Sequence, residues 1–281
     1  MSNRWLTIIK PHNSYFNVNI KEIYQYRDLI YLFVKRDFIS LYKQTILGTL
    51  WFLIQPLMTT LMFFLVFNKI AKIETDQIPP LLFYFSGLTF WSFFSESLLK
   101  TSNTFAENQS IFGKVYFPRL ATPISIVISS FLKFGIQFLL FIVIYFWFVL
   151  FKGLEVNVNI WSLIIPYLVI LTGLLGLGFG IVITSLTTKY RDLRFLIQFG
   201  VQLWMYATPI IYPLSELKGK IRILALINPM TSIVESFKFS IFGSGSIQLL
   251  GLVYSSIFAI VLLTAGVLLF NKTQQNFMDT I

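Results

Sequence analysis

The chain has 281 residues, of which 56% are hydrophobic and 12% are charged, and its mean hydropathy is +0.74. A water-soluble globule cannot cover that much apolar surface, so the composition predicts a polytopic membrane protein. The net charge of +10 favours contact with anionic lipid over nucleic acid, because the basic residues are divided among loops that flank apolar runs. The sequence lacks cysteine and has one histidine, His12, without neighbouring ligands, so no metal site is expected.

The N-terminal region, residues 1–46, contains an amphipathic segment over residues 21–45. Apolar residues recur at helical spacing and form a stripe along one face, and the charged residues lie on the other faces. The stripe consists of Ile23, Tyr26, Ile30, Phe33, Val34, Phe38 and Leu41. The segment is too charged to cross a bilayer, so we predict an interface helix in the headgroup plane, with the stripe against lipid or the bundle. A soluble helix packed under the bundle is the alternative.

Six apolar stretches are long enough to cross the membrane, since a bilayer core about 30 Å thick needs about 20 helical residues. They cover residues 49–69, 81–101, 123–151, 160–187, 195–213 and 247–270, and Pro56 interrupts the first. The runs are continuous and do not alternate, which argues against a barrel. We therefore predict an all-α integral membrane protein with one domain, 1–281, a six-helix bundle over 49–270 and a tail over 271–281.

Lysine and arginine are placed asymmetrically around these stretches. Most of them precede the first, follow the second or follow the fourth, and the tail carries Lys272. The positive-inside rule makes these regions cytoplasmic, so both termini are predicted on that side. The last outer segment is an exception, with Lys218, Lys220, Arg222 and Lys238.

Two cytoplasmic loops mix aromatic and charged residues. The first, residues 103–117, is closed by Pro118, and a short helix there would present both kinds of group to a partner. The second opens with Tyr190-Arg191-Asp192 after the fourth stretch. Anchoring by the positive-inside rule alone would produce similar loops.

Prolines and glycines mark the last part of the chain. The fifth stretch is short and ends between Pro209 and Pro213, which forbid a regular helix there. Residues 221–243 are broken at Asn228-Pro229, so we predict two short re-entrant helices in the outer leaflet. In the fourth stretch Gly176 and Gly180 have the spacing that allows close helix approach, which we interpret as packing.

Two charged residues fall inside predicted spans, where each costs roughly 2.5–3.5 kcal/mol at the span centre. Glu96 and Lys133 lie at similar depth in the cytoplasmic half, and we hypothesise that they neutralise each other, with help from Arg119. Snorkelling of Lys133 to the interface is the alternative.

Aromatic residues make up 18% of the chain. Most are expected in interfacial belts or core packing, yet rings along a channel would suit a sliding sugar chain, because pyranose C–H faces stack on them without a fixed register. The candidates for such a lining are Trp51, Phe52, Tyr84, Phe90, Trp91, Phe94, Trp204, Tyr206 and Tyr212. Catalytic motifs are absent, and the Gly-Lys pairs lack the rest of a phosphate-binding loop, so the chain is not predicted to be an enzyme.

Four motifs occur in order along nearly the whole chain. They are RDFISLYKQTILGTLWFLIQPLM (36–58), KVYFPRLATP (114–123), YRDLRFLIQFGVQLWMYATPIIYP (190–213) and NPMTSIVESFK (228–238). With these motifs the chain resembles the permease subunits of bacterial ABC exporters that move O-antigen, capsule or teichoic acid polymers, the type-2 ABC exporter permeases.

The resemblance implies a homodimer around a channel in the bacterial inner membrane, bound to two copies of a separate ATPase subunit. ATP and Mg²⁺ would belong to that partner, with no cofactor in this chain and no nucleic acid involved. The substrate would be a polysaccharide on undecaprenyl diphosphate, residues 221–243 would be outer gate helices, and Leu47-Gly48 would be the bend into the channel wall. A permease for lipids or small drugs is the nearest rival. A secondary transporter would need more intramembrane ionisable groups and usually more spans with an inverted repeat, and a membrane transferase would need a carboxylate or histidine constellation that the sequence lacks.

By motif matching, the residues that couple to the ATPase would be Phe105, Glu107, Asn108, Phe112, Lys114, Phe117, Tyr190, Arg191, Asp192 and Arg194. By charge alone, the lipid diphosphate would be held by Arg27, Lys35, Arg36 and Lys43. Anchoring to anionic lipid is the alternative role for these four cations.

Overall fold

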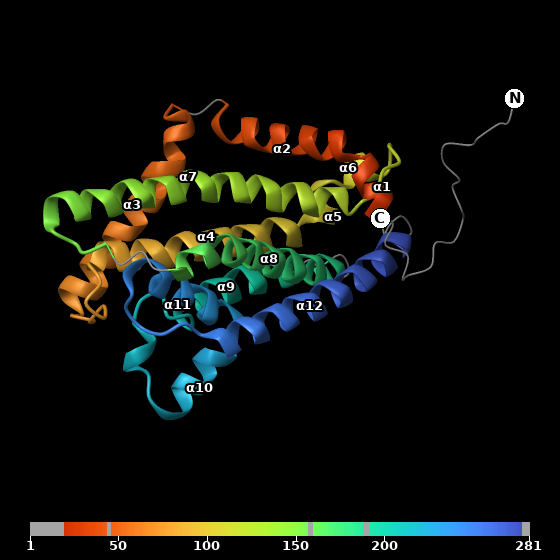
Figure 1. Ribbon diagram of the computed structural model, residues 1–281. Coiled ribbons are helices and arrows are strands. Elements are labelled where there is room, and N and C mark those ends of the chain that lie inside the picture. Colours follow the sequence, from red (N-terminus) through yellow and green to blue (C-terminus); the bar gives the residue numbers. More distant parts are fainter. Residues whose placement is uncertain (1–19, 44–45, 157–159, 188–191, 277–281) are drawn as a thin grey trace, which may run out of the picture.

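The computed structural model describes residues 20–43, 46–156, 160–187 and 192–276, and every element within these ranges is helical. His12, Tyr190 and Arg191 lie outside the described residues. In Figure 1 the long helices run side by side along one axis. One end of this bundle carries α1, α5, α6 and the C-terminal end of α12, and we call it the α5 end. The other end carries α10 and the loop before α4, and we call it the α10 end.

Two helices form the N-terminal arm, α1 (Ile20–Gln25) and α2 (Arg27–Tyr42). In Figure 1, α2 lies beside the N-terminal half of α7. The predicted apolar stripe of this segment faces the bundle, since Phe33 and Val34 are buried and Phe33 contacts Phe117 with 5.7 Å between ring centroids. Of the sequence-based alternatives, contact with the bundle is therefore the one observed. The remaining surface of α2 carries the charged residues.

A sharp bend joins α2 to the next helix at the predicted position. Gly48 has φ +53°, a left-handed conformation that suits glycine, and it opens the short 3₁₀ helix η1 (Gly48–Leu50). The helix α3 (Trp51–Phe63) continues through Pro56 and passes into the π-helix η2 (Phe64–Ile70). Pro56 therefore does not end the helix, and its carbonyl, like that of Gln55, accepts a threonine hydroxyl one turn later.

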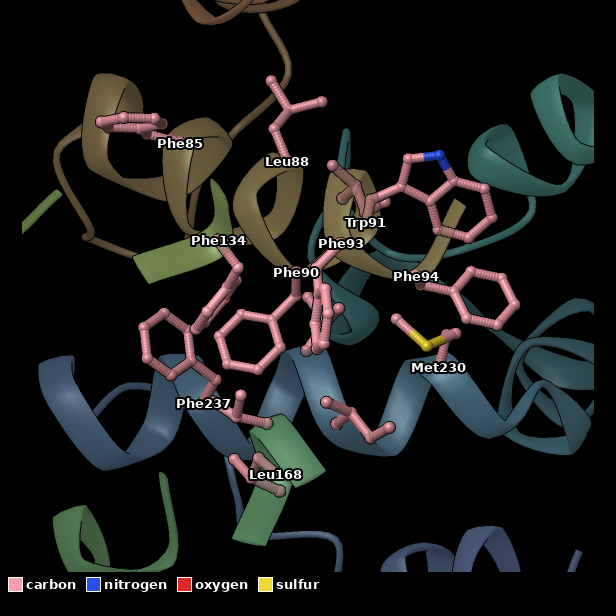
Figure 2. Close-up of a cluster of buried hydrophobic side chains, with 14 of the residues drawn as sticks. Phe85, Leu88, Phe90, Trp91, Phe93, Phe94, Phe134, Leu168, Met230 and Phe237 are labelled. Carbon is pink, nitrogen blue, oxygen red and sulfur yellow. The ribbon is translucent and has the colours of Figure 1, made fainter. Parts of the chain in front are cut away.

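The centre of the bundle is α4 (Pro80–Ser102), which packs against α8 (Ile165–Thr187) and α7 (Ala121–Lys152). A further long helix, α12 (Leu249–Asn276), covers another side of α8, and η3 (Ile160–Ile164) leads into α8. Figure 2 shows the aromatic core between α4, α7 and α11. There Phe90 lies 5.3 Å from Phe134 and 4.5 Å from Phe237 between ring centroids.

Close approach of α4 and α8 depends on the two glycines singled out in the sequence. A Cβ placed on Gly176 would lie 2.7 Å from the Cβ of Ser97, and one placed on Gly180 would overlap Thr101. The second distance, from the Cβ placed on Gly180 to the Cβ of Thr101, would be shorter still. Both distances are shorter than real side chains allow, so each glycine lets the neighbouring helix fit against its backbone. The packing role predicted for this pair is confirmed.

The last third of the bundle is broken into short helices, as the prolines predict. Here α9 (Leu193–Tyr206) is followed by an extended turn, η4 (Leu214–Glu216), α10 (Gly219–Ile227) and α11 (Pro229–Phe242). The break between α10 and α11 is at Asn228. Its side-chain oxygen accepts a hydrogen bond from the backbone amide of Met230, and its side-chain nitrogen donates one to Thr208 Oγ1. The two short helices predicted over 221–243 are therefore present, and they pack differently: α11 is almost wholly buried, whereas α10 exposes Ile221, Ile223, Leu224 and Ile227.

Within the described residues, four helical segments are both long and apolar enough to cross a membrane: Gly48–Ile70, Ala121–Lys152, Ile160–Thr187 and Leu249–Gln274. These match four of the six predicted stretches. The second predicted stretch, α4, is long enough, but its serines, threonines and charged residues lower its hydropathy. The fifth, α9, has 14 residues and is about 21 Å long at 1.5 Å per residue, which is shorter than a bilayer core. The structure supports an integral membrane protein with four such spans.

Candidate functional site

The first cytoplasmic loop of the sequence analysis forms two single-turn helices at the α5 end, α5 (Thr104–Glu107) and α6 (Gln109–Phe112), separated at Asn108. Its three phenylalanines point inward. Phe105 stacks on Phe270 of α12 with 4.7 Å between ring centroids, and Phe112 contacts Phe117. Asn108 is also buried, and its amide donates to the carbonyl of Thr104. These four predicted coupling residues are therefore buried and hold the loop on the bundle.

The exposed part of the same loop consists of other residues. Glu107 and Lys114 are exposed, as predicted, and between α6 and α7 the side chains of Val115 and Tyr116 are 59% and 52% exposed. The Tyr116 hydroxyl donates to Glu22 of α1 over 3.2 Å, and burial together with Glu22 raises the pKa of Tyr116. Val115 and Tyr116 were missed in the sequence because apolar residues in an amphipathic loop are normally assigned to the buried side.

The described end of the second loop lies near Glu107 of the first. Asp192 is exposed and Arg194 is half-buried. Partial burial raises the pKa of Glu107, and so does Asp37, although the nearby Lys100 and Arg194 act in the opposite direction. We call the set Glu107, Lys114, Val115, Tyr116 and Asp192 the loop surface. These exposed residues combine apolar and charged side chains.

The predicted intramembrane charges are in contact. The Nζ atom of Lys133 on α7 lies 2.5 Å from Oε1 of Glu96 on α4, and the Nζ atom of Lys100 lies 2.6 Å from the same oxygen. The second cation is therefore Lys100, one turn along α4, whereas Arg119 donates to the carbonyl of Gln274. The ammonium of Lys133 also lies 5.4 Å from the ring centroid of Phe52, so this charge cluster joins α3, α4 and α7.

Most aromatic residues proposed to line a channel lie inside one subunit. Tyr84, Phe90, Trp91 and Phe94 are buried by other parts of the same chain, and Trp204 packs on Trp91, Phe94 and Phe179. Phe52 is buried beneath Lys133 and beside Phe38. These six side chains pack the bundle, five of them buried and Trp204 half-buried, and such core packing is the alternative that the sequence left open. Trp51 and Tyr206 are exposed, and Tyr212 is partly exposed, with its hydroxyl donating to the carbonyl of Tyr206.

The four cations proposed for a lipid diphosphate are spread along α2 and its end. Arg27 donates to the Tyr24 hydroxyl, and Arg36 forms an ion pair of 2.8 Å with Asp37 while lying over the ring of Phe33. Lys35 and Lys43 are exposed. The structure therefore brings Arg36 to a carboxylate and leaves the two lysines on the surface.

A second buried charge pair lies near the α10 end and was not recognised from the sequence. Lys238 of α11 is 2% exposed, and its ammonium donates to the carbonyl of Pro209 over 2.7 Å and to Glu235 over 3.2 Å. It also lies 3.7 Å from the ring centroid of Phe83 on α4. In the sequence Lys238 was grouped with the cations of the outer loop. Its i, i+3 spacing from Glu235 is the signal that could have identified the pair.

Comparison with known proteins agrees with this architecture. Residues 28–242 match the family model of the ABC-2 type transporter. The chain is 25% identical over 266 residues to the O-antigen export system permease protein RfbA of Myxococcus xanthus, covering 93% of this chain and 98% of that protein. It is 27% identical over 256 residues to the RfbA protein of Klebsiella pneumoniae, covering 90% and 95%. The family match covers most of the chain, and the chain belongs to the ABC-2 type transporter family.

Proposed function

We propose that this chain is the channel-forming permease subunit of an ATP-driven exporter that moves a polysaccharide linked to undecaprenyl diphosphate across the bacterial cytoplasmic membrane. The observation that carries the proposal is the match along nearly the full length to permeases named for O-antigen export. The four apolar spans and the aromatic core are consistent with a membrane-embedded subunit. The chain would not be the ATPase itself.

The proposed assembly is a homodimer bound to two copies of a nucleotide-binding subunit. A conduit between two copies would need membrane-facing surfaces that one subunit leaves uncovered, and α3 and α9 both have such surfaces. On α9, Phe195, Leu196, Phe199 and Leu203 are exposed. On α3, Met58, Leu61 and Met62 are exposed, and so is Leu65 of η2, which continues α3. In this arrangement the exposed residues among the predicted aromatic lining, Trp51 and Tyr206, would be available to the conduit together with Phe195 and Phe199 of α9.

In the proposed topology α4 and α9 also cross the membrane, which gives six spans with both termini cytoplasmic. The α5 end would then be cytoplasmic, and α10 and α11 would be the outer gate helices. Protein covers α4 almost completely, so its polar residues need not meet lipid. The extended turn after α9 would complete the fifth crossing where it is packed against α11.

Coupling to the ATPase is assigned to the loop surface, together with Arg191 and Tyr190 of the second loop. Nucleotide-driven closure of the partner would move α5 and α6. Because Phe105 stacks on α12 and Phe112 contacts Phe117 before α7, a displacement of the loop would be passed to both long helices. The buried phenylalanines would thus transmit the motion, and the exposed residues would make the contact.

Deletion of the gene in its source strain tests the substrate. Loss of the surface polysaccharide, with the lipid-linked polymer accumulating inside the cell, is the expected result, and a plasmid copy should restore export. Unchanged surface polysaccharide with altered susceptibility to drugs or altered membrane lipids would instead support the rival class of substrate and reject the proposal.

A pair of double variants tests coupling. Val115→Ser with Tyr116→Ala alters the loop surface, and Val253→Ser with Tyr254→Ala alters a matching exposed Val-Tyr pair on α12. Co-purification with the ATPase subunit and export should fall for the first and stay normal for the second. Equal behaviour of the two double variants would remove the loop surface from the coupling site.

A further inference from the structure

A polar hollow of about 820 Å³ opens at the α10 end of the bundle. Its walls come from three separate parts of the chain: the loop between η2 and α4, the η4 turn, and the glycine-rich segment after α11. This volume lies within the range of small-molecule sites, roughly 300–1,000 Å³. None of the functions assigned above uses it.

Hydrogen bonds hold the walls of this hollow in place. The hydroxyl of Ser215 in η4 donates to both carboxylate oxygens of Asp76, at 2.8 and 2.9 Å, and so joins segments 139 residues apart. Within the loop, Thr75 donates to the carbonyl of Ile78, and Asn68 of η2 donates to the carbonyl of Ile73. Asp76 and Gln77 both have positive φ, at 47° and 63°, which turns this loop sharply.

The buried Lys238–Glu235 pair lies directly behind the hollow. Glu235 uses Oε1 for Lys238, and its other oxygen lies 4.0 Å from the position a Cβ would take on Gly245, a residue of the hollow wall. Lys238 in turn is fixed to the carbonyl of Pro209. The wall after α11 therefore passes close to this buried charge pair.

The lining selects among classes of ligand. An apolar ligand would find Ile73 as its main apolar partner among polar side chains. An anion would meet the carboxylates of Glu74 and Asp76. A divalent cation would meet Lys72 and, in Asp76, a carboxylate that already accepts a hydrogen bond from the Ser215 hydroxyl. The remaining class is a neutral ligand rich in hydroxyls, which both donate and accept. Carboxylates and the amides of Asn68 and Gln77 suit such a ligand.

We propose that this hollow binds a saccharide unit, as a subsite for the sugar chain on the outer side of the membrane. The assignment of the substrate rests on the proposed function, and the assignment of the side rests on the proposed topology. A site with direct hydrogen bonds but no aromatic platform would hold a sugar weakly, which suits a polymer that must move on. The Asp76–Ser215 pair would be its central contact.

The test uses the purified full chain in lipid nanodiscs and oligosaccharides released by mild acid from the surface polysaccharide of the source strain. Saturation-transfer NMR should detect binding to the wild type, weakened about tenfold or more in a variant combining Asp76→Asn with Ser215→Ala. Ser246→Ala, on an exposed serine outside the hollow, is the matched control and should bind like the wild type. Asp76→Asn alone keeps the size of the side chain and should weaken binding by a smaller factor without loss of folded protein.

Three results would overturn the inference: no binding by the wild type, equal binding by the hollow variants and the Ser246→Ala control, or binding of Ca²⁺ in place of sugar with the same dependence on Asp76. Failure here is separable from failure of the proposed function. If gene deletion abolishes export while the hollow variants bind sugar normally, only the subsite is rejected. If deletion leaves the surface polymer intact while the hollow binds sugar, the export function is rejected, and the hollow remains a sugar-binding site but not a subsite for an exported chain.

Discussion

The helices α3 and α4 follow each other in the chain and have opposite surroundings: α3 is mostly exposed and α4 is mostly buried. In α4 every side chain from Leu82 to Trp91 is buried, and the helix carries serines, threonines and Glu96. In α3 only Phe52 and Thr60 are buried, and the helix is apolar almost throughout. A helix that faces lipid must be apolar, whereas one that protein surrounds can hold polar groups if they find partners. The hydropathy of a helix therefore depends on whether protein or lipid surrounds it, as well as on whether it spans the membrane.

The largest effect is expected where α4 meets α8. Gly180→Leu would drive a side chain into Thr101 and the carbonyl of Leu98, at 3.1 Å from the new Cβ. Overpacking of this kind costs about 3 kcal/mol or more when backbone is in the way, so most of the variant should aggregate on extraction. Thermal unfolding followed by size-exclusion chromatography measures this. The control is Gly135→Leu on α7, where nothing lies within 4 Å of the new Cβ, and equal loss in both variants would contradict the packing argument.

A smaller effect is expected in the charge cluster between α3, α4 and α7. Glu96→Gln leaves Lys133 and Lys100 without their common carboxylate. The cost should be smaller than the about 3–5 kcal/mol of a fully buried pair, because the Glu96 side chain is 24% exposed. Lys133→Met should cost less, because Glu96 keeps Lys100 at 2.6 Å, and Lys100→Met should cost least, because Lys100 is the more exposed of the two lysines. Denaturant unfolding in mixed micelles gives the order. A larger loss for Lys100→Met than for Glu96→Gln would refute the cluster as the stabilising element.

The sequence was sufficient for those features that depend on local chemistry. The helix break at Asn228-Pro229 and the close approach at Gly176 follow from a missing amide and from side-chain size, whereas the bend at Leu47-Gly48 was expected only from the family resemblance. The contact between Glu96 and Lys133 followed from the cost of isolated charge, although the third partner, Lys100, did not, because snorkelling gives the same pattern.

Which way an aromatic side chain points could not be predicted. In helices with few polar residues, a ring has the same apolar neighbours in sequence whether it faces lipid, a conduit or the core. Tyr84, Phe90 and Phe94 therefore gave no sign that they pack within one subunit, and Phe112 gave none that it holds the loop while Tyr116 stays exposed. Packing between segments far apart in the sequence determines which way these side chains point, and the periodicity of the sequence contains no information about that packing.

The link between α3 and the cluster gives an intermediate prediction. Phe52 is the one buried apolar side chain of α3, and it packs against Phe38 and beneath Lys133. Phe52→Ala should cost about 1–2 kcal/mol, less than for a ring in a protein core, because lipid can fill part of the space. Limited proteolysis at the bend near Gly48 should also become faster. The conservative variant Phe52→Leu should restore most of the stability, and protection unchanged in Phe52→Ala would show that α3 is held by other contacts.

The smallest effect on the subunit itself is expected on the exposed side of α3 and of η2, which continues it, and this surface provides the sharpest test of the comparison with α4. Met58→Ala and Leu65→Ala remove apolar side chains that contact little protein in one subunit, so the unfolding free energy should change by less than about 0.5 kcal/mol. If this side faces a second copy, the same variants should weaken self-association in nanodiscs, measured by cross-linking or by single-molecule photobleaching. Leu139→Ala and Val143→Ala on the exposed side of α7 are the lipid-facing comparison. A fall in association for the α7 variants alone would move the subunit contact from α3 to α7. Surfaces that face lipid and surfaces that face a second copy are equally exposed in one chain, so only the response to substitution separates them.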